Sequence, residues 1–148
     1  MPGRARDTSR AAAEAASISD ARAAADTGRG AGSTDPLIGD LRRAGLLPLL
    51  VLHYAAQGPA YGNQLIERIE DLTGGALLVN PNTMYPLLRS LEARGLVAGE
   101  WEHPERRSRR FYRVTDAGLA ERARLAAELE PRLARIARSI RAIRREVL

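Results

Sequence analysis

The chain has 148 residues, 45% of them hydrophobic and 4% aromatic, and its formal net charge is +5. It contains no cysteine, which excludes disulfides, thiolate chemistry and cysteine-ligated zinc. The basic balance favours an anionic partner, either nucleic acid or an acidic membrane surface. The longest apolar run, residues 46–56, is too short to span a bilayer, and no signal peptide is evident. We therefore expect a single-domain cytoplasmic protein with extensions and no membrane partner.

Residues 1–36 are rich in Ala, Gly, Arg and Ser and almost lack large apolar side chains. Such a segment cannot bury enough surface to offset its ordering entropy, which predicts a disordered N-terminal tail. Its five arginines and five acidic residues cancel, so the net charge lies in the remainder. A first buried helix is expected over about 47–56, because Pro48 suits a first turn and Gln57-Gly58-Pro59 ends it. A short turn of helix at 40–43 would precede it.

Two further helices follow. Over 61–72, apolar residues recur at helical spacing with charged residues opposite them, and Thr73-Gly74-Gly75 ends the helix. Asn80 then caps a third helix, with Pro81 at its first position and Gly95 at its end. Pro86 lies inside this helix and predicts a tight or slightly distorted first turn.

Two extended stretches, 96–103 and 109–115, flank the turn sequence PERRS and predict a β-hairpin. A long helix capped by Thr115 or Asp116 continues to Val147. The order helix, helix, helix, hairpin, helix is that of a winged helix-turn-helix. The predicted fold is mainly α with a small β-hairpin: a DNA-binding winged helix-turn-helix domain at 37–116 and a C-terminal dimerisation helix at 117–148.

The hairpin tip carries arginines with no acidic residue among them, which favours contact with phosphates or a minor groove over a merely solvated charge run. These arginines are Arg106, Arg107, Arg109, Arg110 and Arg113. Early positions of the third helix, Asn82, Thr83, Tyr85 and Arg89, are candidates for base and phosphate contacts. Packing in the protein is the alternative for Tyr85. Asn63 and Gln64 complete the candidate DNA-contact set.

The last helix has an apolar seam with alternating steps of three and four residues, which predicts pairing with a partner helix in a homodimer. The alternative is a single helix that packs on its own domain. The predicted dimerisation residues are Leu129, Leu133, Ile136, Ile140, Ile143 and Val147. Pro131 lies off the seam and predicts a kink, and the arginines on the other faces suit a solvated surface.

Nothing in the sequence favours an enzyme. His53 and His103 have no partner at metal-ligand or catalytic-triad spacing, and His53 suits a satisfied core position. No glycine-rich phosphate loop is present, because Gly74-Gly75 ends a helix. We expect no catalytic residues, no metal and no cofactor.

Three segments together resemble the PadR family of transcriptional regulators: GPAYGNQLIERIEDLTGGAL, VNPNTMYPLLRSLEARGLV and EWEHPERRSRRFYRVTDAG. The resemblance covers about residues 46–118. It implies a homodimeric repressor, and many members of the family release DNA when they bind a small-molecule effector. Two recognition helices in such a dimer should read a double-stranded, pseudo-palindromic operator. By matching position, Tyr85, Thr83 and the wing arginines inherit DNA contacts. Asn63 departs from the tyrosine that the family often has after this glycine.

A second hypothesis remains open. The chain could be a small-molecule sensor or protein-interaction adaptor that uses the helical seam and has weak or lost DNA binding. The intact wing and the Asn-Thr-Met-Tyr-Pro start of the third helix argue against it. A membrane-surface function is the weakest hypothesis, because the basic faces lack an apolar wedge.

Overall fold

The computed structural model describes residues 34–148, so the predicted tail over residues 1–33 lies outside the described part. The last residues assigned to that tail are structured. Thr34 Oγ1 accepts a hydrogen bond from the Leu78 amide at 3.0 Å and donates one to the Leu78 carbonyl at 3.3 Å. Asp35 caps the first helix by accepting the Leu37 amide at 2.9 Å.

The first helix therefore begins earlier than the sequence suggested. Helix α1 (Pro36–Leu41) leads into the irregular turn η2 (Arg42–Leu46) and then into helix α2 (Leu47–Ala55). Gly45 has φ +115 inside η2, a conformation that glycine adopts without a Cβ penalty and that breaks the helical path. The sequence indicated only a turn at 40–43, because the Asp35-Pro36 start signal lay in the segment interpreted as tail.

Helices α3 (Gly62–Leu72) and α4 (Pro81–Ala93) match the predicted second and third helices. The Asn80 side chain accepts the Thr83 amide at 3.0 Å, and Pro81 occupies the first turn of α4. These contacts confirm the predicted start of α4. The Asn80 side chain satisfies one of the free amides at the helix N-terminus, and Pro81 has no amide hydrogen that needs a partner. Gly95, with φ +74, follows the end of α4.

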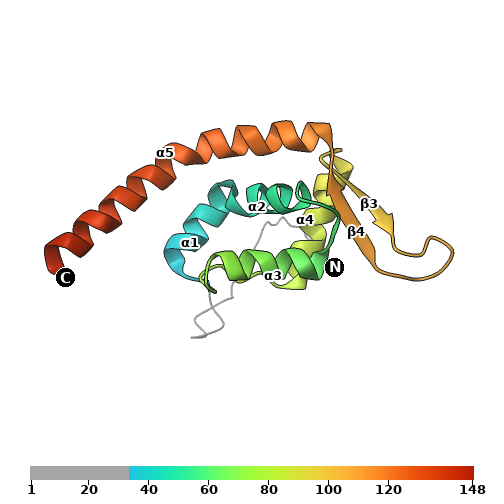
Figure 1. Cartoon of the computed structure of the whole chain (residues 1–148), viewed down its shortest axis with the longest axis horizontal. Coiled ribbons are helices and arrows are strands. Elements are labelled where there is room, and N and C mark those ends of the chain that lie inside the picture. The colour runs from blue at the N-terminus through green and yellow to red at the C-terminus, as the bar shows by residue number, and fades with distance from the viewer. Residues whose placement is uncertain (1–33) are drawn as a thin grey trace, which may run out of the picture.

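A three-stranded antiparallel sheet has the order β2-β4-β3, with strands β2 (Ala60–Tyr61), β3 (Val97–Trp101) and β4 (Arg110–Val114). The hairpin of β3 and β4 was predicted, and Figure 1 shows it projecting from the helices as a wing. Strand β2 was not predicted from the sequence. Ala60 pairs with Tyr112 and Tyr61 with Phe111, so β2 attaches the start of α3 to the base of the wing.

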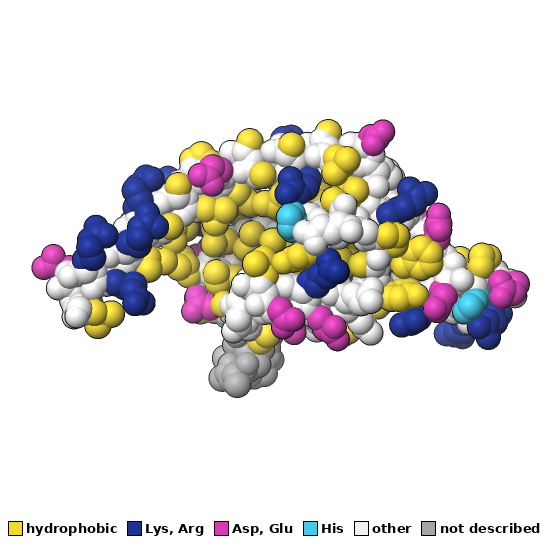
Figure 2. Space-filling model, in the orientation of Figure 1, with side chains coloured by type: hydrophobic (Ala, Val, Ile, Leu, Met, Phe, Trp, Pro, Cys, Tyr) yellow, Lys and Arg dark blue, Asp and Glu magenta, His cyan; other side chains and the backbone are white. Residues whose placement is uncertain are grey.

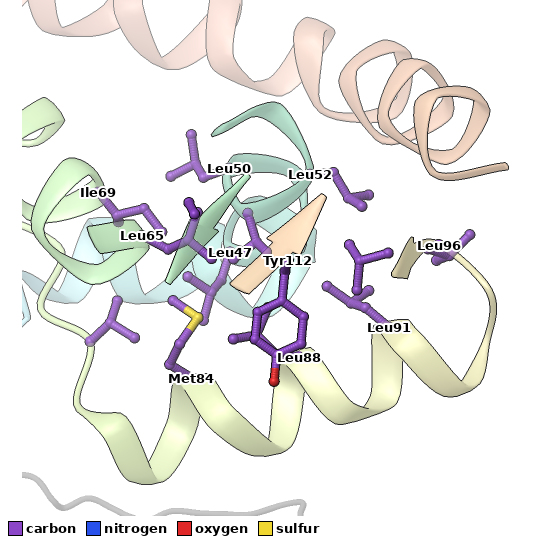
Figure 3. Close-up of a cluster of buried hydrophobic side chains, with 14 of the residues drawn as sticks. Leu47, Leu50, Leu52, Leu65, Ile69, Met84, Leu88, Leu91, Leu96 and Tyr112 are labelled. Carbon is purple, nitrogen blue, oxygen red and sulfur yellow. The ribbon is translucent and has the colours of Figure 1, made fainter. Parts of the chain in front are cut away.

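The core lies between α2, α3, α4 and the sheet. In Figure 3, Met84, Leu88 and Leu91 of α4 point toward Leu65 of α3 and Leu52 of α2. All five side chains are buried, and Tyr112 closes the sheet side of the cluster. Burial of these aliphatic side chains is the main stabilising contribution to the domain.

Helix α5 (Asp116–Val147) begins at the N-cap Thr115, whose hydroxyl accepts the Gly118 amide at 3.0 Å. It crosses α2, and Leu125 and Leu129 are buried. Figure 1 shows α5 bending about midway and extending beyond the domain; Pro131 lies midway between its ends. The structure confirms the mainly helical fold with a small sheet and a long C-terminal helix. Among the described residues, no helix is long and apolar enough to cross a membrane.

Candidate nucleic-acid interface

A groove of about 640 Å³ lies between the start of α3, the face of α4 and the wing sheet. Three segments that are far apart in the chain meet there. It gathers most of the predicted DNA-contact residues beside four aromatic rings. Its lining consists of Tyr61, Asn63, Gln64, Tyr85, Arg89, Glu92, Trp101, Arg109, Arg110 and Tyr112.

Tyr85 lies against the start of α3 because residue 62 is glycine. An ideal Cβ at Gly62 would lie 2.6 Å from Tyr85 Cε1 and 2.8 Å from the Tyr85 hydroxyl oxygen. The ring therefore occupies the space of the missing side chain, and its hydroxyl donates to Asn63 Oδ1 at 3.4 Å. The glycine before Asn63 thus holds the tyrosine of α4 in a defined place at the edge of the groove.

The remaining predicted residues of α3 and α4 differ in their surroundings. The Gln64 side chain accepts the Tyr61 amide at 2.9 Å, so it also helps to cap α3. Arg89 is exposed beside the groove. Asn82 is exposed and Thr83 half-buried in the first turn of α4, and neither lines the groove.

The wing tip is a tight loop between β3 and β4. Ser108 Oγ accepts the His103 amide at 2.9 Å and donates to the His103 carbonyl at 3.0 Å, which closes the loop. Arg106 and Arg107 are exposed at the tip, and neither makes an ion pair with another residue in the range 34–148. Their guanidinium groups have the geometry that bidentate phosphate contact requires.

The other wing arginines do not form the purely basic cluster that the sequence indicated. Arg109 bonds both carboxylate oxygens of Glu102, at 3.3 and 3.4 Å, and lies 3.9 Å above the Tyr61 ring. Hydrogen bonding to Arg109 lowers the pKa of Glu102. Arg113 pairs with Glu100 at 3.4 Å. The acidic partners lie on the opposite strand, where the antiparallel register brings them beside the arginines.

Arg110 faces inward, contrary to its predicted place among the tip arginines. Its side chain is 27% exposed and pairs at 2.5 Å with Glu92, near the end of α4. The Glu92 carboxylate also accepts the Gly99 amide of β3 at 3.3 Å. Glu92 therefore ties α4 to both strands of the wing. Sequence reasoning missed this residue because α4 meets the wing only in the folded chain.

His53 was predicted to be a satisfied core residue. It is half-buried in α2, and Arg122 of α5 bonds its Nδ1 at 2.8 Å. Gln57 contacts its other ring nitrogen at 3.0 Å. Across residues 34–148 no cluster of histidine and acidic side chains is arranged to hold a metal ion.

A winged helix-turn-helix whose helix α4 lies beside a groove lined by aromatic rings and arginines belongs to the class of DNA-binding transcriptional regulators. The profile of the Transcriptional regulator PadR-like family matches residues 51–124, and the chain belongs to this family. Family membership confirms the expectation of a regulator rather than an enzyme.

Known relatives agree with this assignment. A PadR family transcriptional regulator from Eggerthella lenta is 33% identical, with a TM-score of 0.57 over 70% of this chain and 88% of that one. A transcriptional regulator from Clostridium thermocellum shares the fold at 21% identity and a TM-score of 0.58, over 67% of this chain and 96% of that one. A transcriptional regulator of Mycobacterium tuberculosis is 40% identical over 72 residues, which are 49% of this chain and 64% of that protein. The match thus spans less than two thirds of the mycobacterial protein.

Proposed function

We propose that the protein is a homodimeric transcriptional repressor that binds a pseudo-palindromic DNA operator through the groove and the wing tip. One observation carries the proposal. The start of α3, the exposed side of α4 and the wing converge on a single groove, and predicted DNA-contact residues line it. Within this groove Arg89 is exposed, and the half-buried Tyr85 donates its hydroxyl to Asn63 Oδ1.

In this arrangement α4 is the recognition helix. Its first turns would carry Asn82, Thr83 and Tyr85 toward base edges and phosphates, and Arg89 would follow one turn later. Asn63 would orient Tyr85 through their hydrogen bond. Arg106 and Arg107 at the wing tip would contact phosphates beside the groove.

A second copy of the chain is the proposed occupant of the exposed apolar side of α5. Ile140, Ile143 and Val147 are 43, 60 and 67% exposed and follow the steps of three and four residues that a paired helix requires. Leu129 differs from the prediction for this seam, because it is 3% exposed and packs within its own chain. Leu133 and Ile136 are partly buried. The proposed dimer contact therefore lies in the last turns of α5, beyond the domain.

Repression and release by a small-molecule effector complete the proposal, as the family resemblance implies. Helix α5 contains no aromatic residue. A flat aromatic effector stacked between two copies of this helix is therefore not favoured, and an effector would have to bind through aliphatic or polar contacts.

Fluorescence anisotropy on duplex DNA from the protein's own upstream region tests the DNA contact. Wild type is compared with Tyr85→Ala and Arg89→Ala, and Arg43→Ala on η2 is the matched arginine control. The proposal expects binding tighter than to random duplex, a loss of about tenfold in each groove variant, or about 1.4 kcal/mol, and wild-type affinity in the control. If a genome-wide binding selection also finds no preferred site, the adaptor hypothesis replaces this one.

Sedimentation velocity tests the dimer. Ile140→Glu combined with Ile143→Glu places two charges in the proposed contact and should yield monomers with unchanged helical circular dichroism. Dimers that persist in this variant would move the interface to another surface.

A further inference from the structure

The net positive charge of the chain lies at its C-terminal end. Residues 1–130 contain equal numbers of arginine and acidic residues, whereas residues 131–148 contain six arginines and one glutamate. The whole net charge of +5 therefore arises from the last part of α5. Figure 2 shows arginine side chains gathered along this part of the helix, away from the wing.

The DNA-facing part of the domain has little unbalanced positive charge by comparison. Three wing arginines are engaged with glutamates: Arg109 with Glu102, Arg110 with Glu92 and Arg113 with Glu100. A protein that neutralises phosphates needs cations that are free to replace counterions. The groove and wing alone supply few of them.

Four arginines of α5 form a continuous exposed row, which we call the arginine stripe: Arg135, Arg138, Arg141 and Arg145. At 3.6 residues per turn, this row lies roughly opposite the apolar seam that contains Ile140. It therefore stays accessible when the seam is occupied by a second copy. None of the four makes an ion pair with any residue in the described part of the chain.

The spacing of the stripe suits the backbone of duplex DNA. Ten residues at about 1.5 Å each extend over about 15 Å. One strand of duplex DNA carries about four phosphates over the same axial length. Four guanidinium groups thus match about four phosphates in charge and in length, and an arginine fork donates to two phosphate oxygens at once.

We propose that the arginine stripe of α5 binds phosphates of duplex DNA outside the recognition groove and supplies most of the salt-dependent part of DNA affinity. The proposal rests on the proposed function, since it assigns the salt-dependent part of DNA binding to α5 and not to the groove. The groove would select the sequence, and the stripe would hold the duplex without regard to sequence.

The test measures the logarithm of the association constant against the logarithm of salt concentration, for the full chain on random-sequence duplex. Replacing all four stripe arginines by glutamine should flatten this slope by about 3.6 units per bound protomer, at roughly 0.9 unit per phosphate contact. The same four positions changed to lysine are the matched control, and their slope should stay within about one unit of wild type because the charge is kept. A glutamine variant with the wild-type slope overturns the proposal.

Further measurements distinguish DNA binding by the stripe from a change of assembly, from an acidic protein partner and from failure of the proposed repressor function. If sedimentation shows that the fourfold variant changes its assembly, Arg138→Gln with Arg145→Gln replaces it, and about half the effect is expected. Binding to an acidic polypeptide that is lost in the glutamine variant, together with an unchanged DNA slope, would assign the stripe to an acidic protein partner and reject DNA. A wild type with no preferred DNA sequence but a stripe-dependent slope would overturn the proposed repressor and leave the stripe intact.

Discussion

Replacing Gly62 by alanine should weaken DNA binding through Tyr85 while leaving the fold intact. The new Cβ would lie 2.6 Å from Tyr85 Cε1 and 2.7 Å from Cζ, whereas carbon atoms pack at about 3.5–4.0 Å. The ring must therefore move by about 1 Å, and its 3.4 Å hydrogen bond to Asn63 would break. Alanine in a helix is favoured over glycine by about 0.5–1 kcal/mol, and this gain offsets part of the cost of displacing the ring. The melting temperature should therefore change little. We expect a loss of DNA affinity of about 1–2 kcal/mol, or about 5- to 30-fold.

The assay is a double-mutant cycle by fluorescence anisotropy on operator DNA. If Gly62→Ala acts by displacing the ring, it should cost almost nothing further in a Tyr85→Ala background, because the two changes remove the same contact. Gly39→Ala in α1 is the matched control, since the nearest atom to its Cβ is the Thr34 methyl at 4.0 Å. Losses that add in the double variant would refute the reasoning.

Three further predictions concern the contact of α4 with the wing, the packing of α5 and the N-cap of α5. Glu92→Gln should reduce DNA affinity by weakening the charge-assisted hydrogen bond to Arg110, and Arg110→Ala should do the same without altering the salt slope. A slope that falls by about one unit in Arg110→Ala would instead show phosphate contact. Leu129→Ala should lower the free energy of unfolding by about 2–5 kcal/mol at any protein concentration. The effect of Ile143→Ala on the free energy of unfolding should instead depend on protein concentration, because Ile143 is proposed to contact a second copy. The same concentration dependence in both variants would contradict the assignment of Leu129 to the core and Ile143 to the dimer contact. Thr115→Ala removes the N-cap of α5 and should cost about 1 kcal/mol in thermal unfolding, and no change would show that water replaces the cap.

Local signals predicted the elements that local contacts determine. Asn80, Pro81 and Gly95 placed both ends of α4 correctly, because caps and helix-ending glycines act within a few residues. The two-residue strand β2 was not predictable in this way. Its partner residues, Phe111 and Tyr112, lie beyond α3, α4 and β3, and its own Ala-Tyr sequence has no strand period.

The charge pattern of the candidate site was only partly predictable. The arginines around the wing tip looked unopposed because their glutamates lie across the hairpin or on another helix. Once a hairpin is assigned, its register places Glu100 and Glu102 beside Arg113 and Arg109, and that signal was present in the sequence. Leu129 fits a heptad seam and a core position equally well, so periodicity could not tell that this part of α5 packs against its own domain.

The pairing of β2 with β4 also has a consequence for the order of folding. Helices α3 and α4 form through local contacts, whereas β2 and β4 are far apart in the chain, so the entropy of loop closure should slow their pairing at the base of the wing. The chain has a single tryptophan, Trp101, and it lies in β3 within 5.1 Å of Arg110. Trp101 pairs with Arg110 across the β3–β4 hairpin, so its fluorescence follows formation of the hairpin, which is slower than helix formation, while circular dichroism follows the helices. In refolding, the dichroic signal should return first and the tryptophan signal should lag behind it.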